Sequence, residues 1–110
     1  MEGAEQMDIV LGRIQEQAKA EIFRITQHAL EEMDAEEITL AEILAAIANG
    51  QILEHYTEHK RGPCCLLYGQ TYQKRPIHIV CTTAQPVLII ITVHVPLLPK
   101  WVNPTQRRKS

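Results

Sequence analysis

The residues best suited to chemistry are two histidines and a threonine on strand-like segments late in the chain. His78 lies within Pro76–Thr83, and Thr92 and His94 lie within Val87–Val95. An imidazole titrates near neutral pH, so it can take or give a proton under working conditions. Metal-free RNA cleavage needs a base for the 2′-hydroxyl, an acid for the leaving oxygen and cations beside the phosphate. The sequence therefore predicts an acid–base pair of histidines, with Thr92 orienting the site.

Alternation along the two strands sets the expected geometry of these residues, because successive side chains point to opposite faces. If the turn between the strands is centred near Ala84-Gln85, His78 falls opposite or next to Thr92, one pair away from His94. The alternative is that these polar residues line an exposed or partner-covered face of the sheet without catalytic work. The residues expected to share one face of the last strand are Leu88, Ile90, Thr92 and His94.

Four further residues are candidates for the same site. Lys74 and Arg75 fall in an expected turn beside His78, where they would hold phosphate. Tyr68, on a strand, would either stack on an RNA base or pack against its neighbours. His28 lies in the first turn of a helix, where the helix dipole disfavours a positive charge and leaves a neutral ring that could act as a base. The alternative for His28 is a ring that ties the helix to the sheet by a hydrogen bond.

Other catalytic classes find little support in the sequence. His55, Glu58 and His59 match the H-x-x-E-H metal-binding pattern, but that pattern needs a helix and this stretch is predicted to be strand and turn. The only serine is Ser110, which excludes a Ser-His-Asp hydrolase. No carboxylate follows Glu58, so the second half cannot supply a two-metal nuclease site. We therefore expect neither a metal nor another cofactor.

Charge divides the chain into two halves. Residues 1–59 hold all 13 acidic and three basic residues, a net charge of −10, whereas residues 60–110 hold eight basic and no acidic residues, a net charge of +8. The basic half can attract a polyanion although the net charge of the whole chain is −2. RNA is therefore the expected ligand of the second half, and a basic protein segment is the expected partner of the acidic half.

Composition points to one domain in the cytoplasm. The chain has 110 residues, 45% of them hydrophobic, which suits one core. The longest apolar run, Val87–Val95, is far shorter than the roughly 20 residues of a membrane-spanning helix. Neither a membrane association nor an N-terminal signal is expected. Cys64, Cys65 and Cys81 form no C-x-x-C pair and lie among apolar residues, so buried free thiols are expected.

The hydrophobic period changes along the chain. Apolar residues recur at helical spacing from about residue 5 to residue 22, and capping residues Thr26 and Thr39 open two more helices. After Gly50 the period becomes two, and four strands are expected over 51–56, 64–71, 76–83 and 87–95. Pro96, Pro99 and Pro104 argue against regular structure further on, and the basic residues 107–109 should form a loose tail. The predicted fold class is α+β, with N-terminal helices followed by a four-stranded, mainly antiparallel sheet.

Four segments carry a resemblance to a known family. They read RITQHA from residue 24, GQILEHY from residue 50, RPIHIV from residue 75 and IITV from residue 90. Together they resemble the bacterial domain of unknown function 4258, a family that looks related to RelE-like and BrnT-like ribonuclease toxins. The resemblance divides the chain into an N-terminal helix (residues 1–23), a RelE-like α+β domain (24–102) and a basic tail (103–110).

The resemblance implies a metal-independent endoribonuclease toxin that a partner antitoxin silences. In that reading His78 and His94 share acid–base work with His28. The alternative is a non-catalytic interaction module on the same scaffold, which binds a protein partner or forms a homodimer. Two departures from the family pattern stand out. Glu36-Glu37 stand where relatives often carry an arginine, and His94 stands where the strand often continues to a tyrosine.

Overall fold

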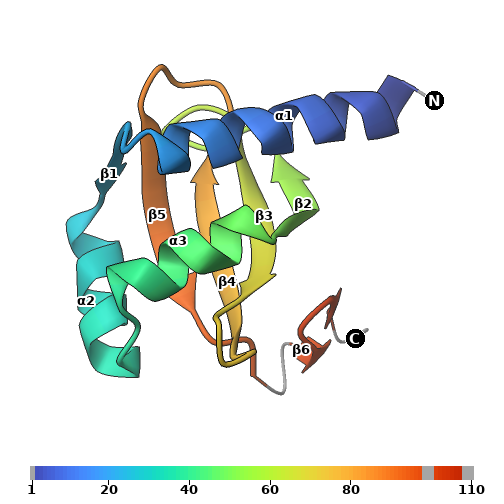
Figure 1. Ribbon diagram of the computed structural model, residues 1–110. Helices are drawn as coiled ribbons and strands as arrows, with labels where there is room; N and C mark the ends of the chain where they lie inside the picture. Colours follow the sequence, from blue (N-terminus) through green and yellow to red (C-terminus); the bar gives the residue numbers. More distant parts are fainter. Residues whose placement is uncertain (1, 98–100, 108–110) are drawn as a thin grey trace.

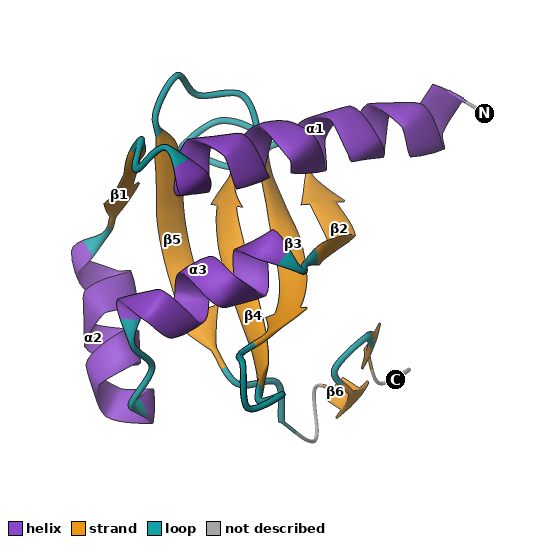
Figure 2. Cartoon of the chain, in the orientation of Figure 1, coloured by secondary structure: helices purple, strands orange, loops and turns teal. Residues whose placement is uncertain are grey.

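Helices α1 and α3 cross one face of a five-stranded sheet, and α2 lies beside the sheet's β5 side (Figure 1). The computed structural model describes residues 2–97 and 101–107. A small two-stranded hairpin follows the sheet near the C-terminus (Figure 2). The elements are α1 (Glu2–Lys19), β1 (Phe23–Ile25), α2 (Gln27–Glu36), α3 (Leu40–Ala48), β2 (Gln51–Tyr56), β3 (Cys64–Gln70), β4 (Pro76–Thr82), β5 (Leu88–His94), β6 (Trp101–Asn103) and β7 (Gln106–Arg107).

The α+β class is confirmed, but the expected four-stranded sheet was wrong. The order of strands is β1-β5-β4-β3-β2, and β2 to β5 pair antiparallel in sequence order. β1 adds a fifth strand that runs parallel to β5, with Phe23 opposite Leu88. Between α1 and β1 the chain changes direction at Glu21, which has a left-handed backbone conformation with a φ of 62°. A strand of three residues is too short to show a period of two, so the sequence pattern left residues 23–25 unassigned between the first helix and the cap at Thr26.

Threonines open the second and third helices as their sequence predicts. Thr26 accepts a hydrogen bond from the Ala29 amide at 3.1 Å. Thr39 and Glu42 form a complete capping box, in which each side chain accepts from the other's backbone amide. These bonds satisfy amide groups that a helix start leaves without partners.

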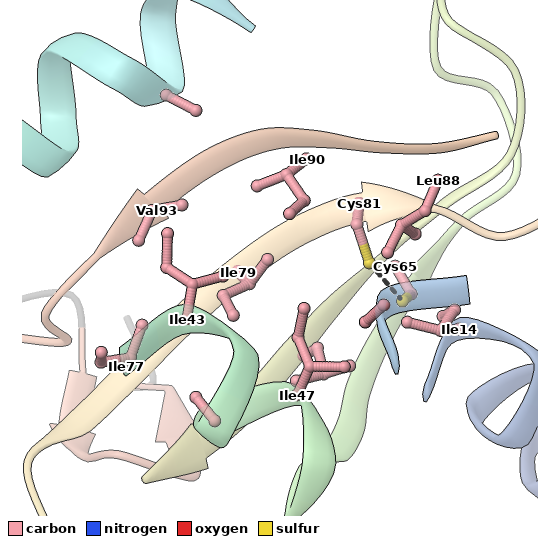
Figure 3. Close-up of a cluster of buried hydrophobic side chains, with 14 of the residues drawn as sticks. Ile14, Ile43, Ile47, Cys65, Ile77, Ile79, Cys81, Leu88, Ile90 and Val93 are labelled. Atoms are coloured by element: carbon pink, nitrogen blue, oxygen red, sulfur yellow. Dashed lines mark hydrogen bonds between the residues drawn. The ribbon is translucent and has the colours of Figure 1, made fainter. Parts of the chain in front are cut away.

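The core lies between the helices and the sheet (Figure 3). Ile14 from α1 and Ile43 and Ile47 from α3 are fully buried against the sheet's apolar residues. Gly69 of β3 permits this contact, since a Cβ atom there would lie 1.8 Å from the carbonyl oxygen of Ala46. The sheet residues of the core are Cys65, Leu67, Ile77, Ile79, Cys81, Leu88, Ile90 and Val93. No helix within the described residues is both long and apolar enough to cross a membrane.

A bulge in β5 changes which residues share a face. Cys81 pairs with Ile90 and Val80 pairs with Thr92, so Ile91 is an extra residue in the ladder. Leu88 and Ile90 therefore face the helices, whereas Thr92 and His94 face the other way. The expectation that all four share one face was wrong, because strict alternation fails where an extra residue is inserted.

Two glutamates of α2 complete the hydrogen bonding of β5 beyond the end of β1. Glu32 accepts from the Val93 amide at 3.0 Å, and Glu36 accepts from the Val95 amide at 3.1 Å. Thr26 donates its hydroxyl to the Ile91 carbonyl at 2.9 Å. Residues four apart lie on one helix face, so α2 offers its carboxylates where another strand would offer carbonyl groups.

The C-terminal segment was expected to lack regular structure, and that expectation was wrong for its described part. β6 and β7 pair antiparallel, with Trp101 opposite Arg107 and Asn103 opposite Gln106. Asn103 accepts two hydrogen bonds from Thr105, which closes the turn around Pro104. Pro104 lies in that turn, so its missing N–H group removes no hydrogen bond between β6 and β7. Arg108 and Lys109, expected to belong to a loose tail, lie outside the described residues.

We expect Gly69→Ala to destabilise the fold, because its new methyl group would overlap the backbone of Ala46. The free energy of unfolding should fall by about 1–3 kcal/mol or more. Gly12→Ala is the matched control, since nothing lies within 4 Å of its Cβ position on α1. At Gly12 the same substitution should raise the free energy of unfolding by up to about 1 kcal/mol, because alanine favours a helix more than glycine does. Urea unfolding followed by circular dichroism measures both, and an equal effect at the two sites would contradict the close contact of α3 with β3.

We expect Glu32→Ala to lower the free energy of unfolding by about 1–3 kcal/mol, because the Val93 amide loses its acceptor. Glu31→Ala makes the same change one residue earlier on α2, where the side chain is exposed. That control should stay within about 0.5 kcal/mol of the wild-type value. Urea unfolding separates the two results. Equal stabilities would show that α2 does not hold the edge of β5 through this carboxylate.

Candidate acid–base site

Three rings stand side by side on the sheet face turned away from α1 and α3. Tyr68 on β3 pairs with His78 on β4, and His78 pairs with His94 on β5. The ring centroids of Tyr68 and His78 are 6.2 Å apart, and those of His78 and His94 are 5.6 Å apart, both edge to face. The structure thus brings both candidate histidines together, closer than expected, because the bulge shifts β5 by one residue.

His78 is fully buried although it lies on the face without helices. Its Nε2 atom lies 2.5 Å from the carbonyl oxygen of Pro104, in the turn of the C-terminal hairpin. A carbonyl group only accepts hydrogen bonds, so Nε2 carries the proton in this contact. Burial lowers the pKa of His78, and positive charge on His94 and Arg107 lowers it further, while the Pro104 carbonyl and Glu54 act in the opposite direction. The ring is therefore held neutral.

A second anchor of the hairpin lies on β2. Arg107 donates to both carboxylate oxygens of Glu54, from Nε at 2.7 Å and from an Nη atom at 2.6 Å. Tyr56 donates its hydroxyl to the same carboxylate at 2.5 Å, and burial together with this bond raises the pKa of Tyr56 to about 12. The two hydrogen bonds to Glu54 raise the pKa of Arg107. The hairpin is thus tied to both β4 and β2.

Glu54, Tyr56 and Arg107 were missed as site residues. The sequence holds one signal, because Glu54 interrupts the alternating apolar positions of Gln51–Tyr56 with a carboxylate. It holds no signal that a basic residue 53 positions later would pair with it. Arg107 was instead assigned to a tail.

Thr92 lies on the same face as the rings, opposite Val80 and two residues from His94. Its hydroxyl oxygen is buried and has no hydrogen-bond partner among the described residues. A buried hydroxyl without a partner is uncommon in native structures. The structure thus places Thr92 beside the rings, with its hydroxyl unused.

The remaining predicted residues lie away from this row. His28 is on α2, with its side chain 65% exposed and its Nε2 atom 3.3 Å from Glu32. Arg75 donates to the carbonyl oxygens of Glu36 and Glu37 at 2.5 and 3.0 Å, at the C-terminal end of α2. Such an end carries partial negative charge, so Arg75 joins helix to sheet here. Lys74 is exposed in the turn before β4.

Neither metal nor thiol chemistry gains a site in the described part of the chain. No group of three histidine, cysteine or acidic side chains there is placed to hold a metal ion. His55 and His59 of the H-x-x-E-H match lie on β2 and in the turn after it, as predicted. Cys65 and Cys81 are buried with their sulfur atoms 4.0 Å apart (Figure 3). Hydrogen bonding to Cys65 and burial raise the pKa of Cys81 well above its ordinary value, so its thiol is neutral and unreactive.

The lowered pKa of His78 predicts a loss of stability in mild acid. The unfolded chain, with an ordinary histidine pKa of about 6.5, binds a proton at a higher pH than the folded chain does. The contribution of the buried neutral ring is therefore complete above that pH and is lost as the pH falls towards the folded pKa. Between about pH 7.5 and 5.5, the free energy of unfolding should fall more for the wild type than for His78→Gln.

Urea unfolding at the two pH values provides the measurement. His55→Gln, which removes an exposed imidazole from β2, should keep the larger loss. An equal loss in the wild type and in His78→Gln would mean that His78 is not held neutral.

Comparisons place the chain in a family. A search of curated proteins and of solved structures finds no match. The family model described as "Domain of unknown function (DUF4258)" matches residues 25–95. This segment begins at the last residue of β1 and includes α2, α3 and strands β2 to β5, with His28, His78, Thr92 and His94, whereas the C-terminal hairpin lies outside it. The chain belongs to the DUF4258 family.

Proposed function

We propose that this protein is a metal-independent endoribonuclease, the toxin of a toxin–antitoxin pair built on a RelE-like scaffold. The observation that carries the proposal is the direct pairing of His78 with His94 on one sheet face. A protonated His94, close enough to lower the pKa of His78, brings to this face the positive charge that a phosphate requires.

The reaction needs only proton transfers. One ring in its neutral form takes the proton of a 2′-hydroxyl, and the resulting oxygen attacks the adjacent phosphorus. The bond from phosphorus to the 5′-oxygen breaks, and the other ring in its charged form gives that oxygen a proton. The products are a 2′,3′-cyclic phosphate and a 5′-hydroxyl end.

The proximity of the two imidazoles supports this division of labour. A positive charge on His94 lowers the pKa of His78, so the pair resists carrying two protons at once. One proton shared between two neighbouring rings gives one base and one acid. The Thr92 hydroxyl, on the same face, is placed to orient a substrate or a ring, while Tyr68 can stack on a base.

A second candidate function, a protein-interaction module, rests on a different surface. A groove of about 540 Å³ lies between α1 and α3. Ala18, Leu44 and Ala48 line the groove, together with Tyr72, which is 89% exposed. An antitoxin segment or a second copy of the chain could occupy such an apolar groove. This surface is compatible with a catalytic toxin and with a non-catalytic module.

We expect the purified protein to cleave single-stranded RNA in the presence of a metal chelator and to leave 2′,3′-cyclic phosphate ends. His78→Gln and His94→Gln should each lower the rate by about 10²–10⁴-fold, because each removes an acid or a base. His55→Gln is the matched control and should cleave at the wild-type rate. Gel analysis of labelled RNA measures the rate and the product ends. Intact RNA with the wild-type chain, and also with Glu54→Arg, which breaks the ion pair that holds the C-terminal hairpin, would exclude the ribonuclease.

A further inference from the structure

The rings proposed for catalysis lie under the chain's own C-terminal segment. His78 is on the sheet face without helices, where a ring would be open to solvent, yet it is fully buried. The described contact at its Nε2 atom is the carbonyl group of Pro104. The hairpin of residues 101–107 therefore stands where an RNA strand would have to lie.

We propose that this hairpin is an intramolecular strap that closes the His78–His94 site and must leave before RNA can bind. The identity of the ligand rests on the ribonuclease function proposed above. The strap is the segment β6 to β7, and its two anchors are the contacts of Pro104 with His78 and of Arg107 with Glu54.

The first anchor imitates a substrate. A phosphate or hydroxyl oxygen that reacts at His78 must approach one of its ring nitrogens within hydrogen-bond distance. The Pro104 carbonyl oxygen occupies that position at Nε2 and fixes the proton there. Nε2 cannot act as a base while this contact lasts, so the strap blocks both access and proton transfer.

The second anchor uses a group that RNA can compete for. A guanidinium binds carboxylate and phosphate with the same two-pronged geometry. Arg107 now makes that pair with Glu54. The side chains of Arg107 and Glu54 are 39% and 28% exposed, so a ligand can approach the pair from solvent. A polyanion near the basic half of the chain could therefore displace Glu54 and draw the strap away.

The family match supports a separate role for this segment. The matched residues end at 95, so both catalytic candidates lie inside the match and both strap residues, Pro104 and Arg107, lie beyond it. The strap is thus an addition to the matched domain that reaches back over its reactive face.

A charge exchange in the full-length chain tests the strap. Arg107→Glu and Glu54→Arg each replace the ion pair by two like charges, which should open the site, whereas the double variant restores an opposite pair. Lys60→Glu and Glu58→Arg are the matched controls, because they make the same charge changes at exposed positions in the turn after β2.

Two measurements are made on each chain. The exposure of His78 is measured by its rate of modification with diethyl pyrocarbonate. The exposed rings of His28 and His55 serve as internal references. RNA binding is measured with a fluorescent 2′-O-methyl oligonucleotide, which lacks the attacking hydroxyl and cannot be cut. Cleavage of the matching RNA is measured separately.

Each single variant should expose His78 and bind the oligonucleotide at least about tenfold more tightly than its own charge control, because the open fraction rises. The double variant should return to within about threefold of the wild type. If the single variants leave His78 protected, or expose it without tighter binding, the strap is overturned. Slower RNA cleavage by both single variants than by their controls also overturns it, because the hairpin would then be part of the catalytic site.

The outcomes separate this inference from the proposed function. If the opened variants bind RNA more tightly but no variant cuts RNA, the strap proposal is supported and the ribonuclease function is excluded. If the wild type and the opened variants cleave RNA at equal rates, the ribonuclease function is supported and the strap proposal is excluded.

Discussion

The extra residue at Ile91 is the constraint on which both faces of the sheet depend. Before it, Leu88 and Ile90 pack towards the helices, and after it Val93 does so as well. Without the bulge, alternation would turn Val93 away from the core and turn Thr92 and His94 into it. The same irregularity that completes the hydrophobic core therefore delivers two polar side chains to the opposite face. There His94 meets His78 directly across the ladder.

Several contacts in the fold join the acidic half of the sequence to the basic half. Arg75 from the basic half is held by backbone carbonyls of Glu36 and Glu37 in the acidic half. Arg107 donates to the side-chain carboxylate of Glu54, across 53 positions of the sequence. The acidic half also contributes Glu32 to the hydrogen bonding of β5. These contacts join the two halves, so the attraction of RNA to the basic half depends on which cations such pairs leave available.

Local signals in the sequence were reliable where one residue controls its own neighbourhood. Thr26 and Thr39 predicted two helix starts, and alternation along Pro76–Thr82 placed His78 on the correct face. Prediction failed where the deciding partner is distant. The run Ile89–Ile91 is apolar on both faces, so nothing in it marks the bulge. The position of Arg107 in the hairpin depends on Glu54, a partner that no local pattern of prolines and basic residues reveals.

The candidate site was predicted in part for the same reason. His78, Thr92 and His94 belong to adjacent strands, and a short turn brings them together with little ambiguity. Lys74 and Arg75 were assigned to phosphate by their position in the sequence, but the side-chain direction of Arg75 follows strand alternation towards the helices. Tyr56 and Glu54 lie on β2, and the hairpin residue that Glu54 contacts is 53 positions away, so no local pattern predicts the contact.

The carboxylates that α2 aligns along β5 have a consequence for assembly. Amide groups at the border of a sheet recruit strands from neighbouring molecules, and here those of Val93 and Val95 are already occupied by side chains. That border is closed to intermolecular growth over this length. A dimer or a partner peptide that extends the sheet by backbone pairing would therefore be directed to the opposite border, at β2, beside the anchor of the strap.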